Sequence, residues 1–122
     1  MSRSWLLYLD DLIACAEKIE RMTSGRNFDQ FVAEEAIFDA VLFNLQVIGE
    51  AVKKLPDEAR VLFTEAHRSA PARLRDLIAH HYFALDPDIV WEVVRRHIPA
   101  LLGEAMVLRF RMDGSSTPTD PK

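Results

Sequence analysis

The chain has 122 residues, of which 49% are hydrophobic and 28% are charged. This length and balance predict one globular domain with a single core, small enough for a second subunit to matter. Fifteen basic residues against 19 acidic residues give a formal net charge of -4, which excludes binding to nucleic acid through overall charge. Any contact with nucleic acid must therefore use a local patch.

Two features of the sequence predict that the protein is neither secreted nor inserted into a membrane. The apolar start at residues 5–9 stops at Asp10 and is too short for a signal peptide, and the longest uncharged apolar run, residues 40–49, cannot span a bilayer. The one cysteine, Cys15, has no partner for an internal disulfide and is expected to pack in the core. We therefore expect a cytoplasmic protein.

The N-terminal pattern predicts an amphipathic helix from about Ser4 to Met22. Its apolar stripe recurs at alternating steps of four and three residues, at Trp5, Leu9, Leu12, Ala16 and Ile19. Gly25 lies in the break that follows. Asn27 with Gln30 then resembles a capping box that opens a second helix.

The second predicted helix is long, running from Asn27 to Pro56 over roughly 40 Å. Large apolar side chains cover more than one of its faces, so burial on one side only would leave some of them in water. They are Phe38, Val41, Leu42, Phe43, Leu45, Val47 and Ile48. A second interface, which we expect to be a homodimer, would cover them.

The next predicted elements are a short helix from Pro56 to about His67 and a helix that begins at Pro71. The inner face of this second helix is expected to carry Leu74, Leu77, Ile78 and His81, with His81 as a packed core histidine.

Asp86 is the expected N-cap of the last helix, with Pro87 as its first residue and Pro99 as the cause of a kink. Residues 113–122 are expected to be a disordered tail, and residues 1–112 one domain. Because no stretch alternates as a strand would, the predicted fold is an all-α, up-and-down antiparallel bundle of about four main helices plus a short one.

The most informative stretch sets Arg75, His80 and Tyr82 within one short segment. An arginine carries a permanent positive charge, a histidine exchanges protons near neutral pH, and a tyrosine offers a modifiable hydroxyl. Such a set suits RNA cleavage, in which the imidazole removes the proton of the 2′-hydroxyl and the guanidinium stabilises the charge on the phosphate. Each residue alone also has a structural interpretation. Arg75 could form a surface ion pair, His80 could be a surface histidine, and Tyr82 could anchor the core.

Helical geometry does not place the three side chains on one face. At about 100° per residue, Tyr82 falls nearly above Arg75, whereas His80 lies roughly 140° around from it. Three arrangements would bring them together: a loosened helix near His80, a bent arginine stem, or a site completed by a second chain. The excess apolar surface of the second helix favours the last.

The order arginine, four residues, histidine, one residue, tyrosine resembles the signature of the HEPN superfamily, in particular its HepT-like branch. The position after the arginine is usually polar in that superfamily, most often asparagine, and here it is Asp76. A looser likeness covers residues 48–51, 82–86 and 90–91. The resemblance implies a metal-independent RNA endonuclease with no cofactor, with Arg75 and His80 as the catalytic pair, that forms dimers as a rule.

The same resemblance implies a partner. HepT-like toxins of type VII toxin–antitoxin systems are paired with an MntA-like nucleotidyltransferase antitoxin, which transfers AMP to the motif tyrosine, here Tyr82. The added charge would block the cleft and repel RNA. The alternative is a noncatalytic helical module that docks a nucleotidyltransferase.

Several residues could support the site. Glu50 could orient Arg75 or His80, and Asp76 and Arg73 flank the motif arginine. A local basic patch could use Arg73, Arg95, Arg96, Arg109 and Arg111, although a solvated helix face balanced by nearby acids is the commoner reading for each. Trp5 and Trp91 are expected to anchor the core. The sequence has no cluster at metal-ligand spacing.

Overall fold

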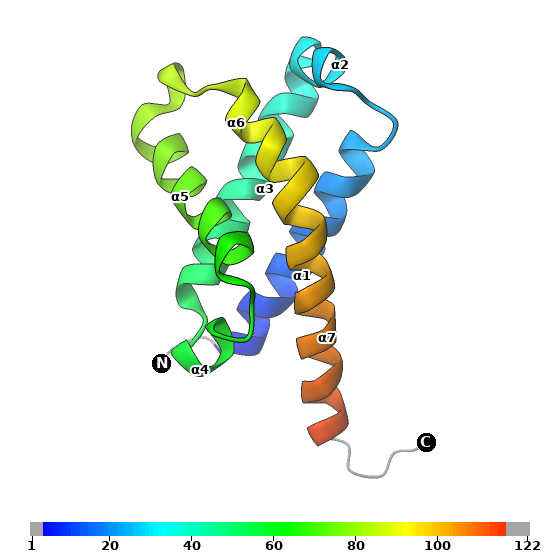
Figure 1. Cartoon of the computed structure of the whole chain (residues 1–122), viewed down its shortest axis with the longest axis vertical. Helices are drawn as coiled ribbons and strands as arrows, with labels where there is room; N and C mark the ends of the chain where they lie inside the picture. The colour runs from blue at the N-terminus through cyan, green and yellow to red at the C-terminus, as the bar shows by residue number, and fades with distance from the viewer. Residues whose placement is uncertain (1–3, 117–122) are drawn as a thin grey trace.

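In the computed structural model of the chain, which describes residues 4–116, four long helical segments run alternately up and down (Figure 1). They are α1 (Trp5–Thr23), α3 (Glu35–Lys54), α5 (Glu65–His81) and α7 (Ile98–Ser116). The shorter elements are α2 (Phe28–Ala33), α4 (Asp57–Arg60), the 3₁₀ turn η1 (Tyr82–Ala84), α6 (Pro87–Glu92) and the π-helical turn η2 (Val93–His97). Residues 4–116 contain no strand, which confirms the predicted all-α bundle.

The first helix and the turn after it are as predicted. The side chain of Ser4 caps α1, and the apolar stripe of α1 is buried, with Leu9, Leu12 and Ile19 fully so. Gly25 has a φ of 76°, which glycine adopts without strain. Asn27 and Gln30 form both bonds of the capping box, at 2.8 and 2.9 Å.

The prediction of one long second helix is wrong, because the chain leaves helical geometry at Glu34, with φ -94° and ψ 87°. In a straight helix, Phe31 and Phe38 would be about 10 Å apart along the axis. At the break their ring centroids come within 5.2 Å of each other, and the ring of Phe31 also packs 4.8 Å from that of Trp91. Burial of this aromatic cluster, together with the ion pair of 2.8 Å between Arg26 and Glu34, accounts for the break.

Helix α3 packs against α1 on one side and α5 on the other (Figure 1), so it has two buried faces within one chain. Most of the apolar side chains that would exceed one buried face are therefore covered within the chain. Val41, Leu42, Leu45 and Ile48 are buried, and Phe38 and Val47 are half-buried. Phe43 alone among the seven is largely exposed, at 64%. The excess apolar surface of α3 is therefore much smaller than its sequence suggested.

The motif helix also begins earlier than predicted. The predicted short helix ends at Arg60, and α5 begins at Glu65, so Pro71 lies inside α5. Glu104 of α7 explains this start, because its carboxylate accepts hydrogen bonds from the backbone N–H of Thr64, at 3.1 Å, and from its hydroxyl, at 2.5 Å. A contact across the bundle thus fixes the start of α5, and the local proline does not.

The last part of the bundle begins as predicted, with Asp86 as N-cap and Pro87 in the first turn of α6. The π-helical turn η2 ends just before α7, so Pro99 falls in the first turn of α7. Proline lacks a backbone N–H, and in the first turn of a helix this loss costs little. Helix α7 extends to Ser116, past the start of the predicted tail, and residues 117–122 lie outside the described part. None of the helices described is long and apolar enough to cross a membrane.

Candidate active site

The site is built at a close approach of α3 and α5, at Gly49. A Cβ atom at Gly49 would lie 2.5 Å from Cβ of Arg75 and 2.7 Å from the carbonyl oxygen of Pro71. Only glycine fits so close to a neighbouring backbone. The stem of Arg75 therefore lies directly over Gly49, next to Glu50.

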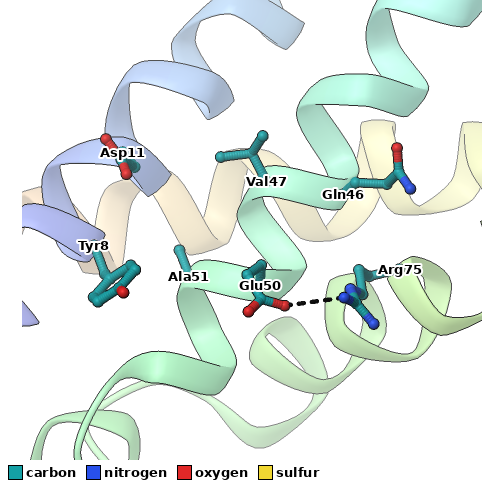
Figure 2. Close-up of a pocket in the computed structure, with 7 residues that line it drawn as sticks. All are labelled: Tyr8, Asp11, Gln46, Val47, Glu50, Ala51 and Arg75. Atoms are coloured by element: carbon teal, nitrogen blue, oxygen red, sulfur yellow. Dashed lines mark ion pairs between the residues drawn. The ribbon is translucent and has the colours of Figure 1, made fainter. Parts of the chain in front are cut away.

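The guanidinium of Arg75 is held by two carboxylates. Its Nη2 lies 3.2 Å from Oε1 of Glu50 and its Nη1 lies 3.3 Å from Oδ1 of Asp76, and Figure 2 shows the first of these ion pairs. Both contacts considered from the sequence are therefore made. Because a guanidinium has five N–H donors, the two contacts orient the group and leave donors for an anion.

Asp76 is compensated by a cation from α3. Nζ of Lys53 lies 2.6 Å from its Oδ1. The pKa of Asp76 lies below its ordinary value of 3.8, mainly because of the hydrogen bond from Lys53. The charge of Lys53 and the contact with Arg75 lower this pKa further. The negative charge of Asp76 is thus balanced within the chain.

Arg75 and Glu50 border an open cleft of about 400 Å³ between α1 and α3 (Figure 2). Its other lining residues are Tyr8, Asp11, Gln46, Val47 and Ala51. The cleft combines an oriented cation with hydrogen-bonding side chains. This is the chemistry expected of a site that binds a phosphate group.

The two motif histidines lie at the end of α5, beyond the reach of the core. Ile78 is the last buried residue of that helix, and residues 79–84 are all exposed. The prediction that His81 packs in the core is therefore wrong, because no described element covers the last turn of α5; Leu77, expected on the same inner face, is also exposed at 38%. His80 is exposed too and does not line the Arg75 cleft.

Tyr82 lies in η1, and its hydroxyl donates a hydrogen bond to Oδ1 of Asp39, at 3.2 Å. The charge of Asp39 is the largest cause that raises the pKa of Tyr82, and Glu35 adds to it. The ring borders a second pocket, of about 320 Å³, with Val32, Glu35, Phe38, Asp39, Phe83, Leu85 and Pro87. No sequence pattern pointed to Asp39, since it precedes Tyr82 by 43 positions.

Arg75 and Tyr82 therefore contact opposite halves of α3. Asp39 and Glu50 are about 16 Å apart along a helix axis. Within one chain, the structure does not bring the arginine and the tyrosine of the motif into one pocket.

The five arginines of the expected basic patch do not gather. Arg73 borders a groove with Glu92 and His97, Arg111 borders a different one on α7, and Arg95 stacks over the ring of Trp91 at 5.3 Å. Arg96 pairs with Glu92 at 3.4 Å, and Arg109 pairs with Asp10 and Asp113 at 2.7 Å each. Arg95, Arg96 and Arg109 therefore have local partners, and both Trp5 and Trp91 pack against the core as expected.

The structure also brings together two histidines that the sequence did not link. Nδ1 of His67 in α5 lies 3.0 Å from Nδ1 of His97 in η2. Burial, followed in effect by the charge of His67, lowers the pKa of His97 below 6.5. Among the residues described, no group of three or more histidine, cysteine or acidic side chains could hold a metal ion.

Comparison with known proteins finds a family model and several relatives that match this chain. Residues 12–108 match the family model described as Ribonuclease HepT-like. A Thermococcus cleftensis protein named "Probable ribonuclease HepT" is 36% identical over 109 residues, covering 89% of this chain and 99% of that protein.

Two other relatives extend this range. A Caldanaerobacter subterraneus protein named as a candidate RNase is 35% identical over 98 residues, covering 77% of this chain and 84% of its own length. A Methanocaldococcus jannaschii protein whose name joins a gamma-glutamylcyclotransferase to a candidate RNase is 32% identical over 113 residues. That match covers 93% of this chain but only 51% of the longer protein. No solved structure matches the chain.

Proposed function

Because this chain belongs to the HepT-like ribonuclease family, we propose that it cleaves RNA without a metal ion, with Arg75 and His80 as the catalytic pair. The imidazole of His80 removes the proton of a 2′-hydroxyl, whose oxygen then forms a bond to the adjacent phosphorus while the bond from phosphorus to the 5′-oxygen breaks. Arg75 stabilises the charge that develops on the phosphate. The observation that carries the proposal is the guanidinium fixed over Gly49 at the rim of the cleft.

The complete site is proposed to form between two copies of the chain, since His80 does not line the Arg75 cleft of its own copy. Phe43, Val47 and Glu50 recur at helical spacing, so the exposed ring of Phe43 shares a face of α3 with the cleft. A second copy that covers Phe43 would lie beside Arg75 and could supply His80.

The test is cleavage of a single-stranded RNA in excess EDTA by the wild type, Arg75→Ala and His80→Ala. Each variant alone should be inactive, and the mixture should regain activity, because one of the two sites in a mixed dimer would hold an intact arginine and histidine. Cleavage by His80→Ala at the wild-type rate would overturn the catalytic assignment. Inactivity of the mixture, or a stable monomer by light scattering at micromolar concentration, would overturn the composite site.

The regulatory part of the proposal concerns Tyr82. We propose that the chain is the toxin of a type VII toxin–antitoxin pair and that an MntA-like nucleotidyltransferase silences it by transferring AMP to Tyr82. Tyr82 is exposed on the surface, at 44%. The added phosphate would place negative charge two residues from His80 and repel RNA. Mass spectrometry after incubation with the nucleotidyltransferase encoded beside this chain and with Mg-ATP should find AMP on Tyr82 and none on Tyr82→Phe.

A second candidate is a noncatalytic module that docks the nucleotidyltransferase. The observation in its favour is that Glu50 and Asp76 both pair with Arg75. Expression in a bacterial host distinguishes the two functions: growth arrest relieved by His80→Ala supports the nuclease, and harmless expression of the wild type supports the module.

A further inference from the structure

The hydroxyl of Tyr82 is held by one acidic side chain. It donates to Oδ1 of Asp39 at 3.2 Å, and the phenol ring packs edge-on against Phe83, with centroids 5.1 Å apart. Asp39 belongs to the long helix α3, whereas Tyr82 lies in the short turn η1. The contact therefore joins the turn η1 to helix α3.

Among the described residues, no other proton acceptor has a comparable position at this hydroxyl. Apart from Tyr82, the titratable side chains that line the pocket are Asp39 and Glu35. Glu35 acts on the tyrosine through its charge, whereas Asp39 acts through both its charge and a hydrogen bond. Asp39 is thus the acid that touches the reactive oxygen.

A tyrosine hydroxyl needs such an acceptor to react as a nucleophile. Phenols ionise near pH 10, so a tyrosine at neutral pH carries its proton. The neighbouring carboxylates raise the pKa of Tyr82 further, so a resting phenolate is disfavoured. The proton must therefore leave while the new bond forms, which requires a base within hydrogen-bond reach, about 2.6–3.2 Å.

We propose that Asp39 is the general base for nucleotidyl transfer to Tyr82, supplied by the substrate protein itself. The phenolic oxygen forms a bond to the α-phosphorus of a nucleoside triphosphate, the bond from that phosphorus to the β-phosphate oxygen breaks, and pyrophosphate leaves. Asp39 takes the phenolic proton and later releases it to water. The inference rests on the proposed role of Tyr82 as an acceptor.

Modification also ends the contact on which it depends. An esterified Tyr82 has no hydrogen to donate, and its phosphodiester carries a negative charge next to Asp39 and Glu35. Repulsion by these carboxylates would move the modified side chain away from α3. Asp39 would then no longer contact the modified tyrosine.

The test is the single-turnover rate of AMP transfer to Tyr82 by the neighbouring nucleotidyltransferase with Mg-ATP, followed by intact mass. Asp39→Asn keeps a hydrogen-bond acceptor and removes the base, so the rate at neutral pH should fall about a hundredfold. The residual rate should then rise with pH, about tenfold per unit while Tyr82 stays mostly protonated. The wild-type rate should change much less, because Asp39 accepts the phenolic proton during the transfer.

Glu35→Gln is the matched control, since it removes the same charge from the same pocket but leaves the hydrogen bond in place. It should keep the rate and pH profile of the wild type. An Asp39→Asn variant as fast as the wild type, or faster, overturns the role of Asp39. Absence of AMP on the wild type overturns the proposed function of Tyr82 itself, and the two failures are therefore distinguishable.

Discussion

The two halves of α3 present different chemistry to the same motif. At the C-terminal half, Arg75 meets Glu50 and Asp76, and Lys53 completes a network in which opposite charges alternate. At the N-terminal half, the charged side chains that line the pocket of Tyr82 are the carboxylates of Glu35 and Asp39, and none of the described residues in that pocket is a cation. The first environment holds a cation ready for an anion, and the second holds a hydroxyl beside a base. The contrast predicts that the proposed cleavage and the proposed control can be separated by mutation.

The largest effect is expected at the arginine end. Arg75→Ala should lower RNA cleavage about a hundredfold or more, because it removes the group that stabilises charge on the phosphate. AMP transfer to Tyr82 should be unchanged, since that end of α3 is intact. Arg26→Ala is the matched control, with a side chain 31% exposed and paired with Glu34, against 33% for Arg75. Equal loss of cleavage in both variants would refute the assignment.

The close helix contact gives the second prediction. Gly49→Ala should lower the free energy of unfolding by about 1–3 kcal/mol, because the new methyl would meet the carbonyl oxygen of Pro71. It should also displace Arg75 and reduce RNA cleavage. Gly103→Ala is the control: its new methyl would have no described neighbour within 4 Å, so chemical denaturation should show unchanged or slightly raised stability.

Acid should destabilise the fold through the contact between His97 and His67 near the start of α5. The pKa of His97 lies below its ordinary value of 6.5, mainly through burial and then through the charges of His67 and Arg96. The unfolded chain therefore binds more protons below about pH 6.5, and stability falls as pH drops below that value; above it there is no effect. Thermal unfolding between about pH 7.5 and pH 5.5 should show this fall, and His97→Gln should reduce it. An equally steep fall in the variant would contradict the assignment.

The smallest effect concerns the tyrosine end. Because Asp39 raises the pKa of Tyr82 above 10.0, the folded state holds this proton more tightly, and the corresponding stability is present below that pH and lost as pH rises through the folded pKa. Absorbance titration of tyrosinate in a Tyr8→Phe background should show Asp39→Asn titrating at lower pH. An unchanged midpoint would mean that the hydrogen bond is not populated in solution.

Features that depend on neighbouring residues could be predicted from the sequence. The capping box of Asn27 and Gln30 and the start of α6 at Asp86 and Pro87 are local hydrogen-bond patterns, and both are found as expected. The all-α class follows from the same kind of evidence. The contact between Arg75 and Glu50 was foreseen as one of several possibilities.

Features fixed across the bundle could not be predicted in this way. The break at Glu34 serves an aromatic cluster that includes Trp91, and the start of α5 depends on Glu104. The hydrogen bond from Tyr82 to Asp39 joins two elements distant in sequence. The apolar surface of α3 was overestimated because one helix can be covered on two faces by its own chain.

The contact at Gly49 has a consequence for the axial register of the two helices. A slide of α5 by one turn, about 5.4 Å, would place its backbone near Leu45 or Lys53, which carry side chains where Gly49 has none. The glycine therefore favours the observed register. Because Glu50 and Asp39 belong to the same helix, that register sets both the arginine and the tyrosine. An insertion between Arg75 and Tyr82 would rotate the tyrosine by about 100° per residue, so the spacing between these two residues fixes which part of α3 each of them contacts.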